Sequence, residues 1–225
     1  RYRSGRSGQR LTRGVIEMAE GNFARGEKLL SRSAPGSDAP LLNYLQAARA
    51  AHLRGNDERR DGWLKEAYEK LPDRKQYEQA LATLRQLEEN SPNHSHALVL
   101  MGRLYYRLED WQQLATLLPR LKKHGRLDEK LLATWTVRVH EEALRSAADA
   151  AAVAHAWNDV PRPFRKNDEL LAAYFSALIR CSEHDQVEKE LAAALKRDWR
   201  GPLVRIYGMA QASDPTRQLK RAETW

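Results

Sequence analysis

A histidine pair lies in the stretch PNHSH, residues 92–96, between two predicted helices. Imidazole nitrogens bind transition metals and haem iron, so His94 and His96 have the right chemistry for either ligand. A zinc site needs at least three protein ligands, however. No third ligand stands near the pair in the sequence. The pattern therefore predicts a solvated loop, and no metal site.

Two further histidines, His140 and His155, lie on predicted helices among apolar neighbours. Each is predicted to be a core or groove histidine whose hydrogen bonds are satisfied by the protein. A histidine in a groove can also bind haem or a porphyrin, and these two are the candidates for that role. No resident cofactor is predicted.

Cys181 is the single cysteine of the chain, and His184 lies three positions later on the same helix face. A cysteine nucleophile needs a base and a third group that orients the base. Asp185 is adjacent in sequence but falls in a predicted turn. Cys181 is therefore predicted to be a structural residue. With no other catalytic set in the sequence, the chain is not predicted to be an enzyme.

Polar side chains recur on the first helix of each predicted helix pair. The first helices line the inner surface of a helical-repeat array, so these side chains are predicted to line a groove for a protein partner. Tyr106 joins them because it directly follows Tyr105 and must face another way. The predicted groove residues are Asn43, Gln46, Arg49, Arg103, Tyr106, Arg107, Arg138 and Arg180. A merely solvated face explains any one of them equally well.

The elements that must position these residues are helices. Ala, Leu, Glu, Arg and Lys dominate the 225 residues, and all are good helix formers. Runs of valine, isoleucine, threonine and aromatic residues, typical of strands, are missing. A composition of 42% hydrophobic and 30% charged residues suits helices with one wet face each.

The clearest helix covers residues 76–93, QYEQALATLRQLEENSPN. Tyr77, Ala80, Leu84 and Leu87 fall on one face of it, and a proline ends it. An aromatic residue, a small residue, two large apolar residues and a closing proline are typical of the second helix of a tetratricopeptide (TPR) repeat. The sequence therefore predicts an all-α fold, an α-solenoid of TPR-like antiparallel helix pairs.

The repeat period tests this interpretation, since TPR units recur about every 34 residues. Phe23 and Asp57 occupy equivalent turn positions one such period apart, and Tyr77 and Trp111 have the same spacing. Asp57 and Tyr77 lie much closer together than one period. The shortfall is about the length of one helix. We expect a helix between about residues 72 and 76 that this sequence lacks.

The remaining repeats predict one superhelical domain over residues 10–225. Pro119 lies inside the helix that follows Trp111, where it should kink the helix or break its last turn. The final helix runs into Trp225 without the polar cap that ends a solenoid. We therefore expect the repeats to continue beyond it.

Positive charge is concentrated at the N-terminus. The net charge is +8, and five arginines without an acid precede Gly14: Arg1, Arg3, Arg6, Arg10 and Arg13. Because the rest of the chain is close to balance, a nucleic-acid-binding surface is not implied. Residues 1–9 contain glycine and serine without periodicity and are predicted to be a flexible basic arm. No apolar run approaches the ~18 residues needed to span a bilayer.

Several stretches together resemble one family. They include EGNFARGEKLL at 20–30, QYEQALATLRQLEENSPNH at 76–94, GRLYYRLEDWQQLATLLPRL at 102–121 and DELLAAYFSALIRCSEHDQVEKELAAALKRDW at 168–199. This series resembles the HemY proteins of proteobacteria, TPR proteins associated with protohaem biosynthesis. The similarity covers about residues 10–225.

The resemblance implies a non-catalytic scaffold that supports haem biosynthesis by binding enzymes of the pathway. It also implies membrane-spanning helices upstream of Arg1 and a TPR domain at the cytoplasmic face of the bacterial inner membrane. The basic arm would then lie beside anionic lipid. Two alternatives stay open: a direct haem or porphyrin carrier, and a generic TPR adaptor or RNA-binding helical repeat. Nucleic acid is not the expected partner.

Overall fold

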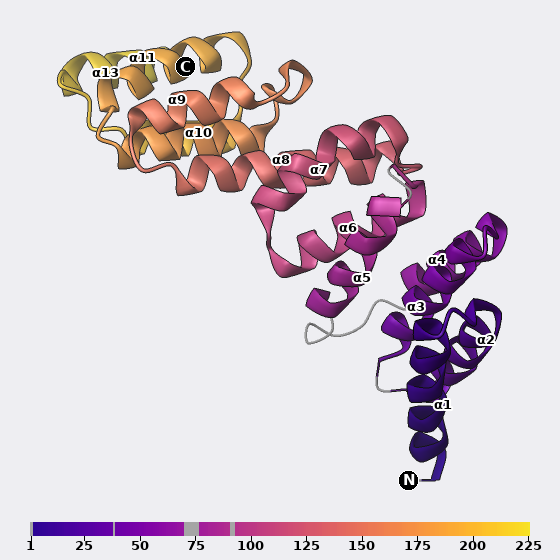
Figure 1. Ribbon diagram of the computed structural model, residues 1–225. Coiled ribbons are helices and arrows are strands. Elements are labelled where there is room, and N and C mark those ends of the chain that lie inside the picture. The colour runs from indigo at the N-terminus through magenta and orange to yellow at the C-terminus, as the bar shows by residue number, and fades with distance from the viewer. Residues whose placement is uncertain (1, 38, 70–76, 91–92) are drawn as a thin grey trace. The chain divides into compact units, whose positions relative to one another are not determined.

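The described part of the chain is helical throughout. The computed structural model describes residues 2–37, 39–69, 77–90 and 93–225, which form thirteen α-helices and two short 3-10 helices (Figure 1). The α-helices are α1 (Tyr2–Ala19), α2 (Phe23–Ser33), α3 (Pro40–Leu53), α4 (Asp57–Glu69), α5 (Tyr77–Asn90), α6 (Ser95–Leu108), α7 (Trp111–His124), α8 (Glu129–Ser146), α9 (Ala150–Asp159), α10 (Asp168–Arg180), α11 (His184–Arg197), α12 (Gly201–Met209) and α13 (Pro215–Glu223). The 3-10 helices are η1 (Ala34–Gly36) and η3 (Arg162–Phe164). The all-α prediction is confirmed. Among the described residues, no helix is both long and apolar enough to cross a membrane.

The chain divides into two compact units, Arg1–Leu132 and Ala133–Trp225. The boundary falls inside α8, so this helix contributes residues to both units. The predicted arm and single superhelical domain are a different division of the chain, and that domain assignment stays a prediction. Each unit is described by itself below.

In the first unit the helices pack on their neighbours in two consecutive sets, α1 to α4 and α5 to α7. α1 contacts α2, α2 contacts α3, and α3 contacts α4. Beyond residues 70–76, α5 contacts α6 and α6 contacts α7. Contacts of α3 with α5 and of α4 with α6 connect the two sets. This sequential packing is what a series of helix pairs requires. The helix expected between about residues 72 and 76 falls outside the described residues.

α3 contacts three other described α-helices of this unit, α2, α4 and α5. Small residues allow this close approach on several sides. Its fully buried alanines are Ala47, Ala48, Ala50 and Ala51. Large apolar side chains fill the remaining space of the unit, and the largest fully buried ones are Leu30, Leu41, Leu45, Leu64, Leu84, Leu98, Leu100, Leu104, Leu114 and Leu121. The unit therefore has a leucine core around an alanine-rich helix.

Glu27 on α2 is a buried carboxylate that joins three helices. It is only 1% exposed. It accepts hydrogen bonds from Arg54 Nη1 at 2.6 Å, Arg59 Nε at 2.5 Å and Trp63 Nε1 at 2.8 Å. Burial alone would raise the pKa of Glu27, but these hydrogen bonds and the charge of Arg59 outweigh burial and lower the pKa. Glu27 thus fixes α2 to the end of α3 and to α4.

A pair of glycines allows α1 and α2 to cross closely. A Cβ atom at Gly14 would lie 2.9 Å from Leu30 Cγ. A Cβ atom at Gly26 would lie 3.0 Å from Met18 Cγ and 3.2 Å from the Gly14 carbonyl oxygen. Both glycines are buried. At this crossing the two helices approach more closely than a side chain at either position would permit.

The flexible arm predicted over residues 1–9 is not observed, because α1 already begins at Tyr2. Within the helix, the Thr12 hydroxyl donates to the Gly8 carbonyl oxygen at 3.1 Å. Glycine and serine lower helix propensity by about 1 kcal/mol or less per residue, so they weaken a helix without stopping it as proline does. The helical hydrogen bonding of α1 therefore begins before Leu11, the residue at which the apolar stripe starts.

The predicted turns are confirmed where glycine supplies a left-handed backbone. Gly21 has φ 80° before α2 begins at Phe23, and Gly55 has φ 71° before α4 begins at Asp57. Glycine adopts these angles without strain. The regular spacing of Phe23 and Asp57 therefore marks two equivalent helix starts.

Pro119 lies inside α7, which continues to His124. The prediction that it breaks the last turn is wrong. Proline removes one hydrogen-bond donor and crowds the carbonyl group four positions earlier, here that of Ala115. Both Pro119 and Ala115 are exposed. Water can therefore serve the freed carbonyl group, and the apolar face of α7 continues through Leu117 and Leu121.

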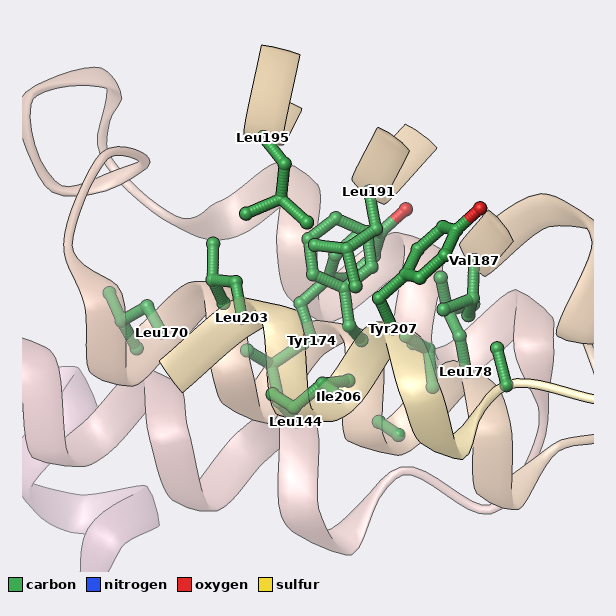
Figure 2. Close-up of a cluster of buried hydrophobic side chains, with 14 of the residues drawn as sticks. Leu144, Leu170, Tyr174, Leu178, Val187, Leu191, Leu195, Leu203, Ile206 and Tyr207 are labelled. Atoms are coloured by element: carbon green, nitrogen blue, oxygen red, sulfur yellow. The ribbon is translucent and has the colours of Figure 1, made fainter. Parts of the chain in front are cut away.

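The second unit is built around one cluster of buried apolar side chains (Figure 2). α10 contacts α9, α11 and α12, and α11 also contacts α12. Tyr174 and Leu178 of α10 lie beside Leu191 of α11 and Tyr207 of α12 in this cluster. Trp157 of α9 stacks on Tyr174 with ring centroids 4.4 Å apart. The unit thus has a core of its own.

Glu188 on α11 is a second buried carboxylate, and it holds the last helix. It accepts hydrogen bonds from the Tyr207 hydroxyl at 3.0 Å and from Arg221 Nη1 at 2.6 and 2.8 Å. Gln218 adds bonds from Nε2 to the carbonyl oxygens of Tyr207 and Ala210. No residue of α13 is buried. Polar contacts to Glu188 therefore fix α13 to its unit.

Candidate functional site

The three predicted groove residues on α3 differ in access. Asn43 is fully buried, and neither polar atom of its side chain has a hydrogen-bond partner among the described residues. Gln46 is half-buried and its Nε2 donates to Thr83 Oγ1 of α5 at 3.5 Å. Arg49 is half-buried. Asn43 therefore does not line an accessible surface, whereas Gln46 and Arg49 are partly open to a partner.

The three groove residues on α6 include one member of the tyrosine pair. Tyr105 is buried and its hydroxyl accepts from Arg85 Nη2 at 3.4 Å. Tyr106 is half-buried and meets Trp111 edge to face, with centroids 5.5 Å apart. The two tyrosines thus play different roles, with Tyr105 in the core.

The arginines of α6 differ in exposure. Arg107 is exposed, and Arg103 is half-buried. Burial, followed by the charge of Arg107, lowers the pKa of Arg103. Arg107, and part of Arg103, are accessible to an anionic partner.

The groove residues of the second unit are engaged in local contacts. Arg138 on α8 pairs with Glu141 and Glu142, each at 2.8 Å. Arg180 Nη2 donates to the carbonyl oxygens of Leu144 at 3.3 Å and Ala147 at 3.0 Å. Arg180 thus serves carbonyl groups at the end of α8. Because these two arginines belong to the second unit, they are placed separately from the set on α3 and α6.

The haem candidates His140 and His155 both lie near one carboxylate. His155 is 82% exposed at its side chain, and its Nδ1 is 3.2 Å from Asp159 Oδ2. His140 is half-buried, and burial lowers its pKa although the charge of Asp159 opposes the shift. His140 is therefore the candidate whose imidazole is held neutral at pH 7.

Four of the N-terminal arginines, Arg3, Arg6, Arg10 and Arg13, lie on α1. Arg10 and Arg13 are exposed, and Arg13 Nε lies 3.8 Å from Glu17 Oε1. The side chains of Arg1, Arg3 and Arg6 lie outside the described set. Contact with a lipid surface stays a prediction for all five.

The residues around Cys181 have structural contacts. Cys181 is half-buried against the core of the second unit. His184 Nδ1 accepts from the Gln211 amide at 3.2 Å, and Asp185 Oδ1 accepts from the Ser213 amide at 2.8 Å. His184 and Asp185 thus hold the loop before α13.

One cluster of metal-ligand type was not predicted from the sequence. Asp61 of α4 joins His94 and His96, and one ligand atom of each lies within 4.8 Å of the other two. All three residues are half-buried. His94 Nε2 is 2.6 Å from Asp61 Oδ1, and the centroids of the two imidazole rings are 5.9 Å apart. The missing third ligand of the sequence pattern comes from another helix.

The protonation of His94 follows from its surroundings. Burial, followed by the charge of Arg60, lowers the pKa of His94 against the opposing effect of Asp61. Its Nδ1 accepts from the Ala97 amide at 3.5 Å at the start of α6. Nε2 therefore carries the proton and donates it to Asp61, in a hydrogen bond between a neutral imidazole and a carboxylate.

Arg60 orients the carboxylate of this cluster. Its Nε donates to Asp61 Oδ1 at 2.9 Å, and its Nη1 donates to Asp57 Oδ1 at 2.6 Å. Burial alone would raise the pKa of Asp61, but the hydrogen bond from Arg60 and the neighbouring charges lower it. Asp61 is thus ionised at neutral pH.

Comparison with known proteins agrees with the resemblance seen in the sequence. Residues 1–55 match the family model described as HemY protein N-terminus. The chain is also 26% identical to Protein HemY of Escherichia coli K12, in a match that covers 86% of this chain and 53% of that protein. Over most of its length this chain is similar to HemY proteins. Protein HemY of Shigella flexneri matches to the same extent.

The chain spans about half the length of the curated HemY relatives it matches. No solved structure matches it. The HemY match runs over 214 residues, whereas 86% of the 225 residues here is about 194. HemY therefore carries about 20 positions within the match that have no counterpart in this chain.

The N-terminal HemY match contains the tightest helix crossing described above. Residues 1–55 include α1, α2 and α3, with both glycines of the α1/α2 crossing and the Glu27–Arg54 pair. The matched segment therefore includes the close packing of α1 on α2 and one of the contacts of the buried Glu27 carboxylate, that with Arg54.

Proposed function

We propose that this HemY-family chain is a non-catalytic scaffold that supports haem biosynthesis by binding enzymes of the pathway. Partners dock on the first helices of TPR-like helix pairs. The chain acts at the cytoplasmic face of the bacterial inner membrane, where tethering raises the effective concentration of the bound enzymes. The likeness to HemY over 86% of the chain is the observation that carries the proposal.

The arrangement of the first unit supports a repeat scaffold. Within α1 to α4 and within α5 to α7 its helices pack in chain order, and the helix starts at Phe23 and Asp57 keep the TPR period. The HemY positions without a counterpart here are numerous enough to contain the helix that the period requires before α5. A TPR-type solenoid is thus the interpretation that explains both the packing and the spacing.

The accessible arginines of α3 and α6 indicate the class of surface that docks there. Arg49 is half-buried and Arg107 is exposed, while Asn43 is buried and plays no part in contact. An acidic partner surface would complement these arginines. Exposed charges of this kind affect the association rate and its salt dependence more than they affect affinity.

Binding of purified haem-pathway enzymes from the same organism tests the proposal. We expect at least one enzyme to bind the immobilised chain, and the variant Arg49→Glu/Arg107→Glu to bind it at least tenfold more slowly at low salt. The matched control is Lys122→Glu/Lys123→Glu, which makes the same charge change at exposed positions of α7. If no enzyme of the pathway binds, or if the control loses as much as the groove variant, the proposal fails.

Direct haem or porphyrin binding is a second candidate, favoured by the state of His140. An imidazole held neutral by burial can bind iron without losing a proton. Addition of haem to the purified chain should then shift the Soret band, and His140→Ala should abolish the shift. His155→Ala is the comparison, since that exposed imidazole lies near the same carboxylate.

A further inference from the structure

The cluster of Asp61, His94 and His96 supplies three ligands from two helical segments to one point. Asp61 comes from α4, His94 is the N-cap residue of α6, and His96 is in its first turn. We propose that these three side chains bind a divalent transition-metal ion of the Zn²⁺ class. The ion would join α4 to the start of α6.

The donor set favours this class of metal. Two imidazoles and one carboxylate are common ligands of Zn²⁺, with a fourth position left for water or another ligand. Ca²⁺ and Mg²⁺ instead require mostly oxygen ligands. The backbone of His94 is extended, with φ −65° and ψ 116°, just before the helix begins. Because the backbone changes conformation here, the rings of His94 and His96 lie close together, with centroids 5.9 Å apart.

His96 is available as a ligand. It contacts the ring of His94, but its nitrogens make no hydrogen bond with any described residue. Arg60 Nε holds the Asp61 carboxylate through a hydrogen bond of 2.9 Å to Oδ1. A positioned carboxylate and an available imidazole are what a metal site needs before the ion arrives.

Metal binding would require only local movement. Bonds of about 2.0–2.1 Å to a tetrahedral ion place ligand atoms roughly 3.3 Å from each other. His94 Nε2 and Asp61 Oδ1, now 2.6 Å apart, would separate by less than about 1 Å, which a side-chain rotation provides.

The proton of His94 has a defined destination. It leaves Nε2, which becomes the metal ligand, and Nδ1 carries a proton in the bound form, so no proton need be released. Nδ1 then stops accepting from the Ala97 amide. That bond is 3.5 Å long and is the longest of the side-chain caps at the helix starts described here.

Arg60 sets a limit on the site. Its guanidinium group lies next to Asp61 and repels a second cation. Zn²⁺ and Co²⁺ overcome this repulsion because they form partly covalent bonds with imidazole nitrogens. Mg²⁺ binds through charge alone and does not overcome it. The site should therefore discriminate strongly between Zn²⁺ or Co²⁺ and Mg²⁺.

Titration of the whole chain with Co²⁺, after removal of any histidine tag, tests the proposal. We expect visible absorption bands of tetrahedral Co²⁺ that saturate at one ion per chain and disappear on addition of Zn²⁺. Mg²⁺ in large excess should not remove them. His96→Ala and Asp61→Ala should each weaken Co²⁺ binding at least tenfold.

His155→Ala is the matched control, because it removes an exposed imidazole beside a carboxylate in the other unit. It should bind Co²⁺ as the parent chain does. His96→Ala removes no hydrogen bond to a described residue, so its helical circular dichroism should match the parent and show that lost binding is not lost folding. Absence of saturable Co²⁺ binding, or equal binding by His96→Ala and the parent chain, would overturn the proposal.

Discussion

Glu27 and Glu188 are buried carboxylates that connect helices in the same way, one in each unit. Each accepts from arginine and from one aromatic donor, the Trp63 indole or the Tyr207 hydroxyl. A buried charge is costly unless paired and hydrogen-bonded, so each glutamate depends on all of its donors. Exposed pairs such as Arg145–Glu142 contribute much less.

Glu27→Gln should lower the free energy of unfolding of the first unit by about 2–4 kcal/mol at pH 7, since Arg54 and Arg59 lose their charge partner. The pKa of Glu27 is lowered in the folded protein. Its contribution is therefore complete above the unfolded pKa and is lost as the pH falls through the folded value. Urea unfolding of both proteins at decreasing pH should show the difference shrinking.

Glu58→Gln provides the control for this substitution. Glu58 is exposed in the first turn of α4. Its replacement should change the unfolding free energy by about 0.5 kcal/mol or less at every pH. Equal effects of the two substitutions would show that the buried contacts of Glu27 do not stabilise the unit.

Tyr207 should ionise at a much higher pH than an ordinary tyrosine does. Burial, followed by the hydrogen bond to Glu188, raises its pKa to about 12. Stability that Tyr207 contributes is present below the unfolded pKa of about 10 and is lost as the pH rises toward 12. The phenolate absorbance difference between the parent chain and Tyr207→Phe should be absent near pH 10. A difference that titrates at pH 10 would contradict the buried contact.

Residue-level prediction from the sequence succeeded for local patterns and failed for packing. Tyr105 and Tyr106 face different ways, as their adjacency on a helix requires. Asp61 could not be found, because it lies far from His94 along the chain and meets it only when α4 packs on α6. Asn43 was misplaced because a rotation of about 100° separates successive residues on a helix, so a neighbouring position faces the core.

At the scale of elements, the α1/α2 crossing depends on the absence of side chains. Gly26→Val should destabilise the first unit by about 1–3 kcal/mol, because its new atoms meet Met18 and the carbonyl group of Gly14. The Met18 side chain can move aside, but the backbone of Gly14 cannot. Thermal or urea unfolding measures the change.

Gly62 is the opposite case and serves as the control. It lies within α4, and a Cβ atom there would meet nothing within 4 Å. Gly62→Ala should therefore stabilise the chain by about 0.5–1 kcal/mol through helix propensity alone. If both glycine substitutions change stability in the same direction, the close crossing of α1 and α2 does not determine the effect of Gly26→Val.

Helix positions were largely predictable because turn residues and apolar stripes are local signals. The helix expected after Trp111 is observed as α7, which begins at that residue. Two expectations differ from the structure. Pro119 was expected to kink α7 or break its last turn, and the last turn instead continues to His124. Glycine and serine were expected to prevent a helix before Leu11, but they only weaken one.

At the scale of the whole molecule, the two units have separate cores and should respond separately to core mutations. Leu191→Ala, in the second unit, should cost about 2–5 kcal/mol and speed amide hydrogen exchange in α10 to α12. Exchange in α2 to α4 should stay as in the parent chain. Leu45→Ala should give the reverse pattern. Uniform faster exchange along the chain in either variant would show a single cooperative unit.

The division into two units was not predicted, although the helical class was. Repeat periodicity reports that each helix pair packs on the next, but it does not report how strongly. The break depends on the long-range contacts of each helix, and it falls inside α8, which is one continuous helix. Only the folded contacts reveal that its two ends belong to different cores.

The glycine crossing of α1 and α2 has a consequence for recognising distant relatives. A lineage that gains a side chain at Gly14 or Gly26 must shift one helix or compensate at Met18 or Leu30. Positions 14 and 26 lie on either side of the turn between α1 and α2. Small residues should therefore be retained at both positions even where the neighbouring residues change. A search of genomes for this spaced pair, followed by a glutamate directly after the second glycine, would separate HemY-type N-termini from unrelated helical repeats.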